Sequence, residues 1–269
     1  MLGSIRIDEA LKRAKERLAK VSERPLLEAE LLLAHTLGKD RVYLHTHPEA
    51  EVPGRFWELV KRRALHEPLE YITGKVSFFG KEFLIEPGVL IPRPETERLI
   101  EELLPHLHGK EQVVEIGVGS GVISTILKLH LPGLKVVATD IDPKALDLAK
   151  KNFDRFGVDV ELRLSDLAEG VGGCDVIVSN PPYIAKDFPL PKNVAMYEPP
   201  QALFGGERGD ELLGRIIEYF LQSPAKILAC EMGYDQKEAI QKRFENFSGT
   251  LDFYKDLAGL DRGFIARKR

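Results

Sequence analysis

The stretch Asn180-Pro181-Pro182-Tyr183 joins an amide, two prolines and a phenol. It comes one residue, Ser179, after the apolar run Val176-Ile177-Val178. Such a run is typical of a buried strand in a parallel sheet, and open α/β sheets bind ligands beyond the carboxyl ends of these strands. The prolines fix φ and remove two backbone donors, so the chain here is stiff and presents carbonyl acceptors. The stretch indicates a ligand pocket in which the chain supplies hydrogen-bond acceptors and the Tyr183 ring supplies a flat wall. A simple turn after a strand is the alternative.

A glycine-rich turn follows a second apolar run. Its residues are Glu115, Gly117, Val118, Gly119, Ser120 and Gly121. Alternating glycines let a ligand lie against bare backbone at a helix N-terminus. Asp140 ends the next strand, where an acidic residue binds ribose in nucleotide-binding folds. The pattern predicts a nucleoside-containing cofactor. The Gly-x-Gly-x-Gly spacing disfavours a dinucleotide, and a tight structural turn is the alternative.

Glu115 narrows the choice of cofactor, because a carboxylate beside exposed backbone suits a cationic ligand group better than a pyrophosphate. S-adenosylmethionine carries an amino group and a sulfonium, and its ribose would reach Asp140. Asp166 and Leu167 end a third strand, where they would flank the adenine. The alternative for Asp166 is a helix N-cap.

With these motifs the chain resembles class I S-adenosylmethionine-dependent methyltransferases that act on a planar nitrogen. More closely, it resembles the HemK-type protein-(glutamine-N5) methyltransferases, which modify the Gly-Gly-Gln motif of class 1 peptide chain release factors. The matching motifs are the glycine turn, Asp140, Asn180–Tyr183, Phe79-Gly80, Leu90–Glu97 and Tyr197–Gly206. The chain departs from the family pattern at Val118, where threonine is usual, and at Leu167, where an aromatic residue is common.

The same residues suggest a mechanism. The Asn180 side-chain oxygen and the Pro181 carbonyl would each accept one N–H of the target amide, beside Pro182, while Tyr183 would pack against the amide plane. The protein would then mainly position the amide in line with the methyl group of S-adenosylmethionine. After the transfer, the cofactor would leave as S-adenosylhomocysteine. An adenine-N6 DNA or RNA methyltransferase and a non-catalytic S-adenosylmethionine-binding partner of the translation machinery are the alternatives.

Three segments are expected to hold these residues. Residues 1–72 form a helical substrate-recognition domain, 73–92 form a hairpin and connector, and 93–269 form the methyltransferase domain. In the first segment, apolar residues recur at helical spacing over 5–18, over 26–37 and after Pro53.

Strand and helix signals alternate in the last segment. Strands are expected at 112–116, 134–139, 158–164, 175–179 and 225–231, and helices at 97–107, 121–131, 143–156, 209–222 and 235–246. Two strand-like runs, 250–255 and 263–267, follow at the end. The pattern predicts an α/β, Rossmann-like, mostly parallel sheet with a C-terminal antiparallel hairpin, preceded by a small all-helical domain. This is the class I methyltransferase fold that the resemblance implies.

Composition narrows the function classes. The 269 residues carry a net charge of −4, with 43% hydrophobic and 30% charged residues, as in a globular protein. Residues 1–72 hold 13 Lys and Arg against 12 Asp and Glu, so no basic footprint for nucleic acid is expected. Two cysteines without a CxxC motif, and no HExxH motif, predict a reduced cytoplasmic protein without a metal site. No signal-peptide pattern or membrane-spanning run is present, and a monomer is expected.

Overall fold

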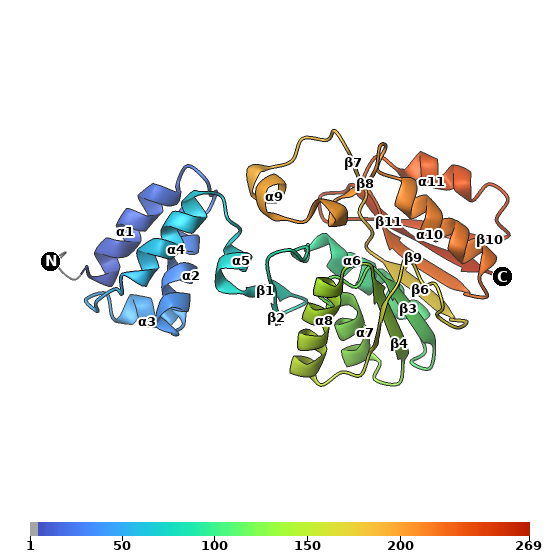
Figure 1. Ribbon diagram of the computed structural model, residues 1–269, viewed down its shortest axis with the longest axis horizontal. Helices are drawn as coiled ribbons and strands as arrows, with labels where there is room; N and C mark the ends of the chain where they lie inside the picture. Colours follow the sequence, from blue (N-terminus) through green and yellow to red (C-terminus); the bar gives the residue numbers. More distant parts are fainter. Residues whose placement is uncertain (1–4) are drawn as a thin grey trace. The chain divides into compact units, whose positions relative to one another are not determined.

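The structure, a computed structural model, describes residues 5–269 and consists of two units (Figure 1). The first unit comprises the chain up to Lys75 together with Leu190–Tyr197. The second comprises Val76–Pro189 and Glu198–Arg269. Residues 1–4 of the expected helical domain lie outside the described residues. The segment Leu190–Tyr197 belongs to the helical unit although it lies inside the expected methyltransferase domain, and its sequence gives no sign of this.

The first unit is built from helices. They are α1 (Ile7–Leu18), α2 (Pro25–Leu37), α3 (Arg41–Thr46), α4 (Arg55–Ala64), α5 (Leu69–Thr73) and α9 (Lys192–Tyr197). The periodic apolar residues of α1, α2 and α4 meet in one core, which includes Ile7, Leu18, Leu32, Leu33, Phe56 and Val60. The helix α2 begins at Pro25 and ends at Leu37. The next residue, Gly38, has a left-handed φ of 63°, which favours glycine.

The second unit is organised around a seven-stranded sheet in the order β10-β11-β9-β6-β3-β4-β5. The strands are β3 (Gln112–Ile116), β4 (Lys135–Asp140), β5 (Glu161–Leu164), β6 (Val176–Ser179), β9 (Ile227–Glu231), β10 (Gly249–Lys255) and β11 (Asp261–Lys268). β3, β4, β5, β6 and β9 run parallel, whereas β11 is antiparallel to both β9 and β10. The expected mostly parallel sheet with a C-terminal antiparallel hairpin is confirmed.

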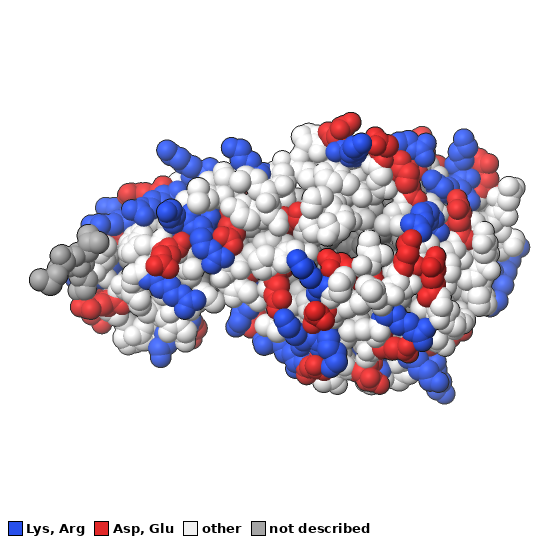
Figure 2. All heavy atoms as spheres, viewed as in Figure 1, with Lys and Arg blue, Asp and Glu red and all other residues white. Residues whose placement is uncertain are grey.

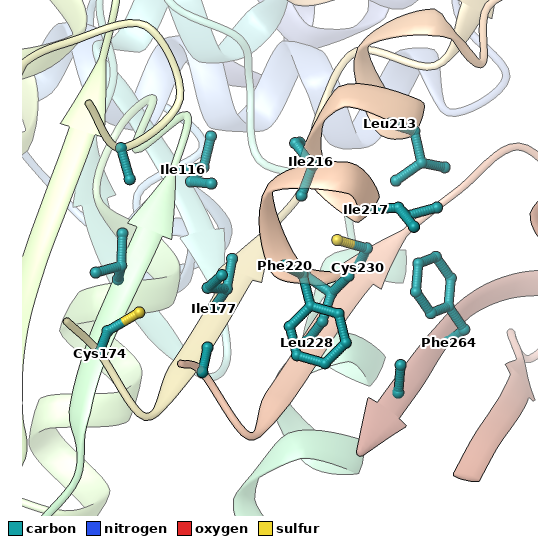
Figure 3. Packing of buried hydrophobic residues seen from close by; sticks show 14 of the residues in the cluster. Ile116, Cys174, Ile177, Leu213, Ile216, Ile217, Phe220, Leu228, Cys230 and Phe264 are labelled. Carbon is teal, nitrogen blue, oxygen red and sulfur yellow. The ribbon is translucent and has the colours of Figure 1, made fainter. Parts of the chain in front are cut away.

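Helices cover both faces of this sheet (Figure 1). They are α6 (Glu95–Leu103), α7 (Val122–His130), α8 (Pro143–Phe156), α10 (Glu211–Gln222) and α11 (Lys237–Arg243). In β3, Glu115 bonds to α7, while Val114 and Ile116 pack in a cluster with α10. Because successive side chains of a strand point to opposite faces, α7 and α10 lie on opposite sides. Figure 3 shows Phe220 of α10 beside Leu228 and Cys230 of β9 in this cluster.

The differences from the sequence prediction concern short elements and boundaries. The hairpin expected around Gly80 is present as β1 (Lys75–Phe78) and β2 (Lys81–Leu84). The sequence does not predict α3, α5, α9, the 3-10 turns at Leu104–His106 and Pro200–Ala202, or the paired strands β7 (Ile184–Ala185) and β8 (Phe204–Gly206). Elements of two to six residues are too short to show a period. Over residues 5–269, no helix is long and apolar enough to cross a membrane.

Candidate active site

The candidate site lies where β3 and β6 end side by side. The chain leaves β3 towards β4 on one side and leaves β6 towards β9 on the other. A crevice at the carboxyl ends of the strands forms at such a switch point, and this is where α/β sheets bind ligands. A cavity of about 500 Å³ lies here, and Gly117, Gly119, Asp140, Asn180 and Pro182 contribute to its wall. The predicted cofactor and substrate motifs therefore meet at one cavity.

Two glycines of the turn after β3 present bare backbone. Gly117 and Gly119 have φ of 75° and 52°, and a Cβ added at either residue would meet no atom within 4 Å. Gly121 differs, because its Cβ would lie 2.8 Å from the ring of Phe153 in α8. The first two glycines thus face open space, and the third lets two helices approach. Val118, Ser120 and Gly121 shape the turn but do not line the cavity.

Glu115 lies under this turn rather than on the cavity wall. Its side chain is buried, and its Oε2 accepts hydrogen bonds from the backbone N–H of Ser124, at 3.0 Å, and from the Ser124 hydroxyl. Burial raises the pKa of Glu115 to about 8. Glu115 therefore holds the start of α7, and its contact with a cationic ligand group stays a prediction.

Asp140 stands on the cavity wall at the end of β4. Its Oδ2 accepts the backbone N–H of Gly119 at 3.0 Å, and its Oδ1 accepts that of Asp142 at 3.0 Å. Burial raises its pKa, although both amide hydrogen bonds oppose that effect. Asp140 thus fixes the glycine turn and places a carboxylate at the edge of the cavity.

Asp166 and Leu167 line the same cavity after β5. Asp166 pairs with Arg215 of α10 at 2.7 Å between Oδ2 and Nη2. A turn, not a helix, follows Asp166, so the alternative of a helix N-cap is wrong. Leu167 has a φ of 52° and packs against the core under α10. Their contact with an adenine stays a prediction.

The motif after β6 is held from behind. Asn180 is on the cavity wall, and its Nδ2 donates to the Thr96 hydroxyl at 2.9 Å. Pro182 is also on the wall, whereas Pro181 is buried and does not line the cavity. The Tyr183 hydroxyl donates to Oε1 of Glu231 at 2.7 Å, and burial raises the pKa of that phenol. The proposed substrate contacts of Pro181 and Tyr183 stay predictions.

The sequence marked parts of the opposite walls as family motifs but did not place them at the cavity. Gly88, Val89 and Leu90 form one, and the segment from Pro199 to Gly206 forms much of the other. Glu198, which is buried, joins them: Oε2 accepts the N–H of Ile91 at 3.1 Å, and Oε1 accepts Nη2 of Arg93 at 2.6 Å. The signal in the sequence that could have pointed to these walls is their proline content. The stretches Pro92-Arg93-Pro94 and Glu198-Pro199-Pro200 are both stiff, and each lies next to one of the two wall segments.

Two further residues behind Asn180 were also missed as part of the site. A helix was expected from residue 97, which would place Thr96 just before it. In the structure α6 begins at Glu95 without a side-chain cap, and the Thr96 hydroxyl donates to Oε2 of Glu231 at 2.7 Å. Glu231 itself was assigned only to the end of a strand.

The chain matches two family models, "PrmC N-terminal domain" over residues 9–74 and "Methyltransferase small domain" over residues 94–194. It is 39% identical over 275 residues to a release factor glutamine methyltransferase of Koribacter versatilis (strain Ellin345), covering 97% of this chain and 96% of that protein. A protein of the same name from Geobacter sulfurreducens (strain ATCC 51573 / DSM 12127 / PCA) is 40% identical over 256 residues, covering 89% of this chain and 88% of that protein.

The solved structures support the fold. A methyltransferase from Pyrococcus furiosus superposes with a TM-score of 0.55 at 22% identity, covering 71% of this chain and 91% of that one. The α/β unit has the class I methyltransferase fold that the sequence predicted. With near-complete coverage of relatives above 30% identity, the chain belongs to the release factor glutamine methyltransferase family.

Proposed function

We propose that this protein transfers a methyl group from S-adenosylmethionine to the side-chain amide nitrogen (N5) of the glutamine in the Gly-Gly-Gln motif of class 1 peptide chain release factors. The names of its relatives and its methyltransferase fold support the reaction class. The observation that carries the proposal is the position of Asn180 on a cavity wall that also bears the glycine turn and Asp140. The enzyme would act as a monomer in the cytoplasm, where release factors work.

The cavity suits S-adenosylmethionine. Open space over Gly117 and Gly119 leaves backbone accessible to a ligand, and the Asp140 carboxylate is placed for ribose hydroxyls. Leu167 and Ile141 supply apolar surface for a flat base. When bound, the cofactor supplies an electrophilic methyl group on a sulfonium. Asp166 would reach the same region, whereas Glu115, Val118, Ser120 and Gly121 would support the turn from below.

Asn180 supplies what an amide substrate needs. Because its Nδ2 is used by Thr96, its Oδ1 is the atom left to accept a hydrogen bond from a substrate. An amide nitrogen is a poor nucleophile, since its lone pair is delocalised into the carbonyl. Acceptors fixed at Asn180 and the Pro181 carbonyl would orient the NH2 group and favour positive charge as it develops on nitrogen. Once the methyl group has moved from sulfur to nitrogen, the nitrogen would lose one proton to water. Pro182 and Tyr183 would bound the substrate site.

An exocyclic adenine amine would fit the same acceptors, so nucleic acid is the second candidate substrate. The charge of the protein opposes it. The net charge is −4, and acidic and basic side chains are interspersed on the face shown in Figure 2. Nucleic-acid enzymes rely on a basic surface to hold the phosphate backbone.

The test offers methyl-labelled S-adenosylmethionine and the purified protein to release factors, DNA and ribosomal proteins in parallel. We expect label only in a release factor, on the Gly-Gly-Gln glutamine by mass spectrometry. Asn180→Ala removes an acceptor that matters most as charge builds, so kcat should fall by about 10²–10³-fold. Asn180→Asp keeps an acceptor and should retain more activity than Asn180→Ala. Labelled DNA, or wild-type turnover by Asn180→Ala, would refute the proposal.

A further inference from the structure

A chain of hydrogen bonds runs behind Asn180, away from the cavity. Asn180 Nδ2 donates to Thr96 Oγ1 at 2.9 Å, and Thr96 Oγ1 donates to Glu231 Oε2 at 2.7 Å. The other carboxylate oxygen of Glu231 accepts the Tyr183 hydroxyl at 2.7 Å. Thr96 is 2% exposed and Glu231 is 0% exposed, so water does not compete for these bonds. The chain joins the loop after β6 to α6 and to the end of β9.

The protons of this chain can be counted. A threonine hydroxyl has one proton, and an ionised carboxylate only accepts. Since Thr96 gives its proton to Glu231, its oxygen must receive a hydrogen bond from Asn180. Only the NH2 end of the Asn180 amide can donate it, so that end is held at Thr96 and the oxygen end is directed away. The carboxylate of Glu231 on β9 thereby fixes which end of the Asn180 amide, in the loop after the neighbouring strand β6, is available to a substrate.

We propose that Thr96 and Glu231 are positioning residues that orient the Asn180 amide so that its oxygen faces the substrate. This inference rests on the proposed function, in which that oxygen accepts an N–H of the target glutamine. Neither residue touches the reacting atoms, and both act through Asn180.

The surroundings of Glu231 fit this role. Burial raises the pKa of Glu231, whereas the hydrogen bonds from Thr96 and Tyr183 and the charge of Arg262 oppose that effect. Arg262 itself is paired with Asp256, at 3.0 Å from its Nε and 2.9 Å from its Nη2. The proposed arrangement has Glu231 ionised, with one hydroxyl donor on each oxygen: Thr96 on Oε2 and Tyr183 on Oε1. A glutamine at position 231 could accept from only one of them, because its NH2 end must donate.

The first test compares Thr96→Val, which removes the hydroxyl but keeps the shape, with Thr96→Ser, which keeps the hydroxyl. Thr96→Val should lower kcat about tenfold or more with little change in KM for the release factor. Thr96→Ser should keep most of the wild-type kcat. Glu231→Gln should lower kcat by about as much as Thr96→Val does. Thr125→Val is the matched control, because Thr125 is equally buried but its hydroxyl has no partner among the described residues.

A double-mutant cycle separates positioning from general damage. If Thr96 acts through Asn180, then adding Thr96→Val to Asn180→Ala should cost little further turnover. Additive losses would overturn the proposal, since they would mean that Thr96 contributes by another route.

A second readout needs no activity. The chain has four asparagines, Asn152, Asn180, Asn193 and Asn246, so selective ¹⁵N-asparagine labelling gives four side-chain NH2 signals, and Asn180→Ala assigns one of them. The Asn180 signal should exchange with solvent slowly in the wild type and about tenfold or more faster in Thr96→Val. Asn152 is the internal control, since its Nδ2 donates to Leu84 O at 3.0 Å and Ser120 O at 2.8 Å.

The outcomes distinguish the two proposals. If the wild type methylates a release factor but Thr96→Val keeps both wild-type kcat and wild-type exchange at Asn180, the positioning proposal fails and the proposed function stands. If the wild type methylates no release factor, the proposed function fails, and unchanged exchange in Thr96→Val still decides against the hydrogen-bond chain.

Discussion

Glu115 and Glu231 are buried carboxyl groups at the ends of two strands of one sheet. The hydrogen-bond donors around them are neutral: Ser124 for Glu115, and Thr96 and Tyr183 for Glu231. Burial raises the pKa of both groups. Carboxyl groups of this kind cost stability when ionised, and they cluster at functional sites. Here one supports the glycine turn and the other supports Asn180.

The pKa of Glu115 leads to a prediction for stability. Its folded pKa of about 8 lies above its ordinary value of 4.5, so between these values the folded protein holds a proton that the unfolded chain has released. Stability from this group is therefore fully present below the unfolded pKa and is lost as pH rises towards 8. The loss approaches about 1.4 kcal/mol per pH unit for one proton.

Glu115→Gln should remove this loss, because the glutamine is neutral and can still accept from Ser124. Urea unfolding at several values from pH 5 to 8 measures the difference in unfolding free energy between wild type and variant. We expect the wild type to become less stable relative to Glu115→Gln as pH rises from 5 to 8. Glu231 contributes equally to both proteins and cancels. Parallel curves would show that Glu115 is ionised throughout.

Asp140→Ala tests the proposed ribose contact. The substitution leaves ribose hydroxyls without a charged acceptor, which should weaken S-adenosylmethionine binding by about 1–3 kcal/mol in calorimetry. Since Asp140 also accepts the N–H of Gly119, part of the loss comes from a looser turn. Asp142→Ala is the control, because Asp142 lines the same cavity and its Oδ1 accepts the nearby N–H of Lys144 rather than an N–H of the glycine turn. Equal losses in both variants would place the ribose elsewhere.

At this scale the sequence predicted residues that follow strands and could not predict residues that meet only in space. Gly117, Gly119, Asp140 and Asn180 come to one cavity because each follows a recognisable parallel strand. Thr96 is a different case, since it reaches Glu231 across 135 residues of sequence. No local pattern marks such a pair, and a threonine after prolines suggests a helix start.

At the scale of elements, close approach decides the shape of the segment after Asn180. Strand β7 pairs with β8, and the turn after β8 crosses directly behind it. A Cβ added at Gly209 would lie 2.5 Å from the carbonyl oxygen of Tyr183 and 2.7 Å from the N–H nitrogen of Ala185. The atoms that this Cβ would meet belong to the backbone, so rotation of a side chain cannot relieve the clash.

Gly209→Ala should therefore displace the segment after Asn180. Gly209 also has a left-handed φ of 90°, so strain adds to the clash. Gly157→Ala is the matched control, because Gly157 has a φ of 64° and open space around it. The control should lose about 1–2 kcal/mol from strain alone. Gly209→Ala should lose about 1–3 kcal/mol more in chemical unfolding, together with turnover. Equal losses would show that the segment yields without cost.

The regular elements were predictable and the irregular ones were not, for the same physical reason. The strands β3, β4, β6 and β9 are mostly buried and rich in apolar residues because helices cover both faces, and such runs stand out in a sequence. The pairing of β7 with β8 depends on two short segments about 20 residues apart, and neither has a pattern of its own.

At the scale of the whole molecule, the chain passes between its two units more than once. It leaves the helical unit after Lys75, returns at Leu190 and leaves again after Tyr197. Within the helical unit, the Tyr197 hydroxyl donates to the Leu65 carbonyl at 2.8 Å. The segment that directly follows, from Pro199 to Gly206, lines the cavity. The helical unit is thus covalently continuous with one wall of the site through α9.

This connectivity sharpens the proposal that residues 1–72 recognise the protein substrate. A variant that lacks the chain up to Lys75 and carries a Gly-Ser linker in place of Leu190–Tyr197 removes the helical unit without leaving α9 unpartnered. We expect it to bind S-adenosylmethionine in calorimetry as the full chain does, because every residue of the cavity wall lies in the other unit. It should methylate a short Gly-Gly-Gln peptide at the full-length rate but lose most of its kcat/KM on an intact release factor, since only the intact factor offers surface beyond the glutamine. Wild-type kcat/KM on the intact factor would assign the helical unit another role.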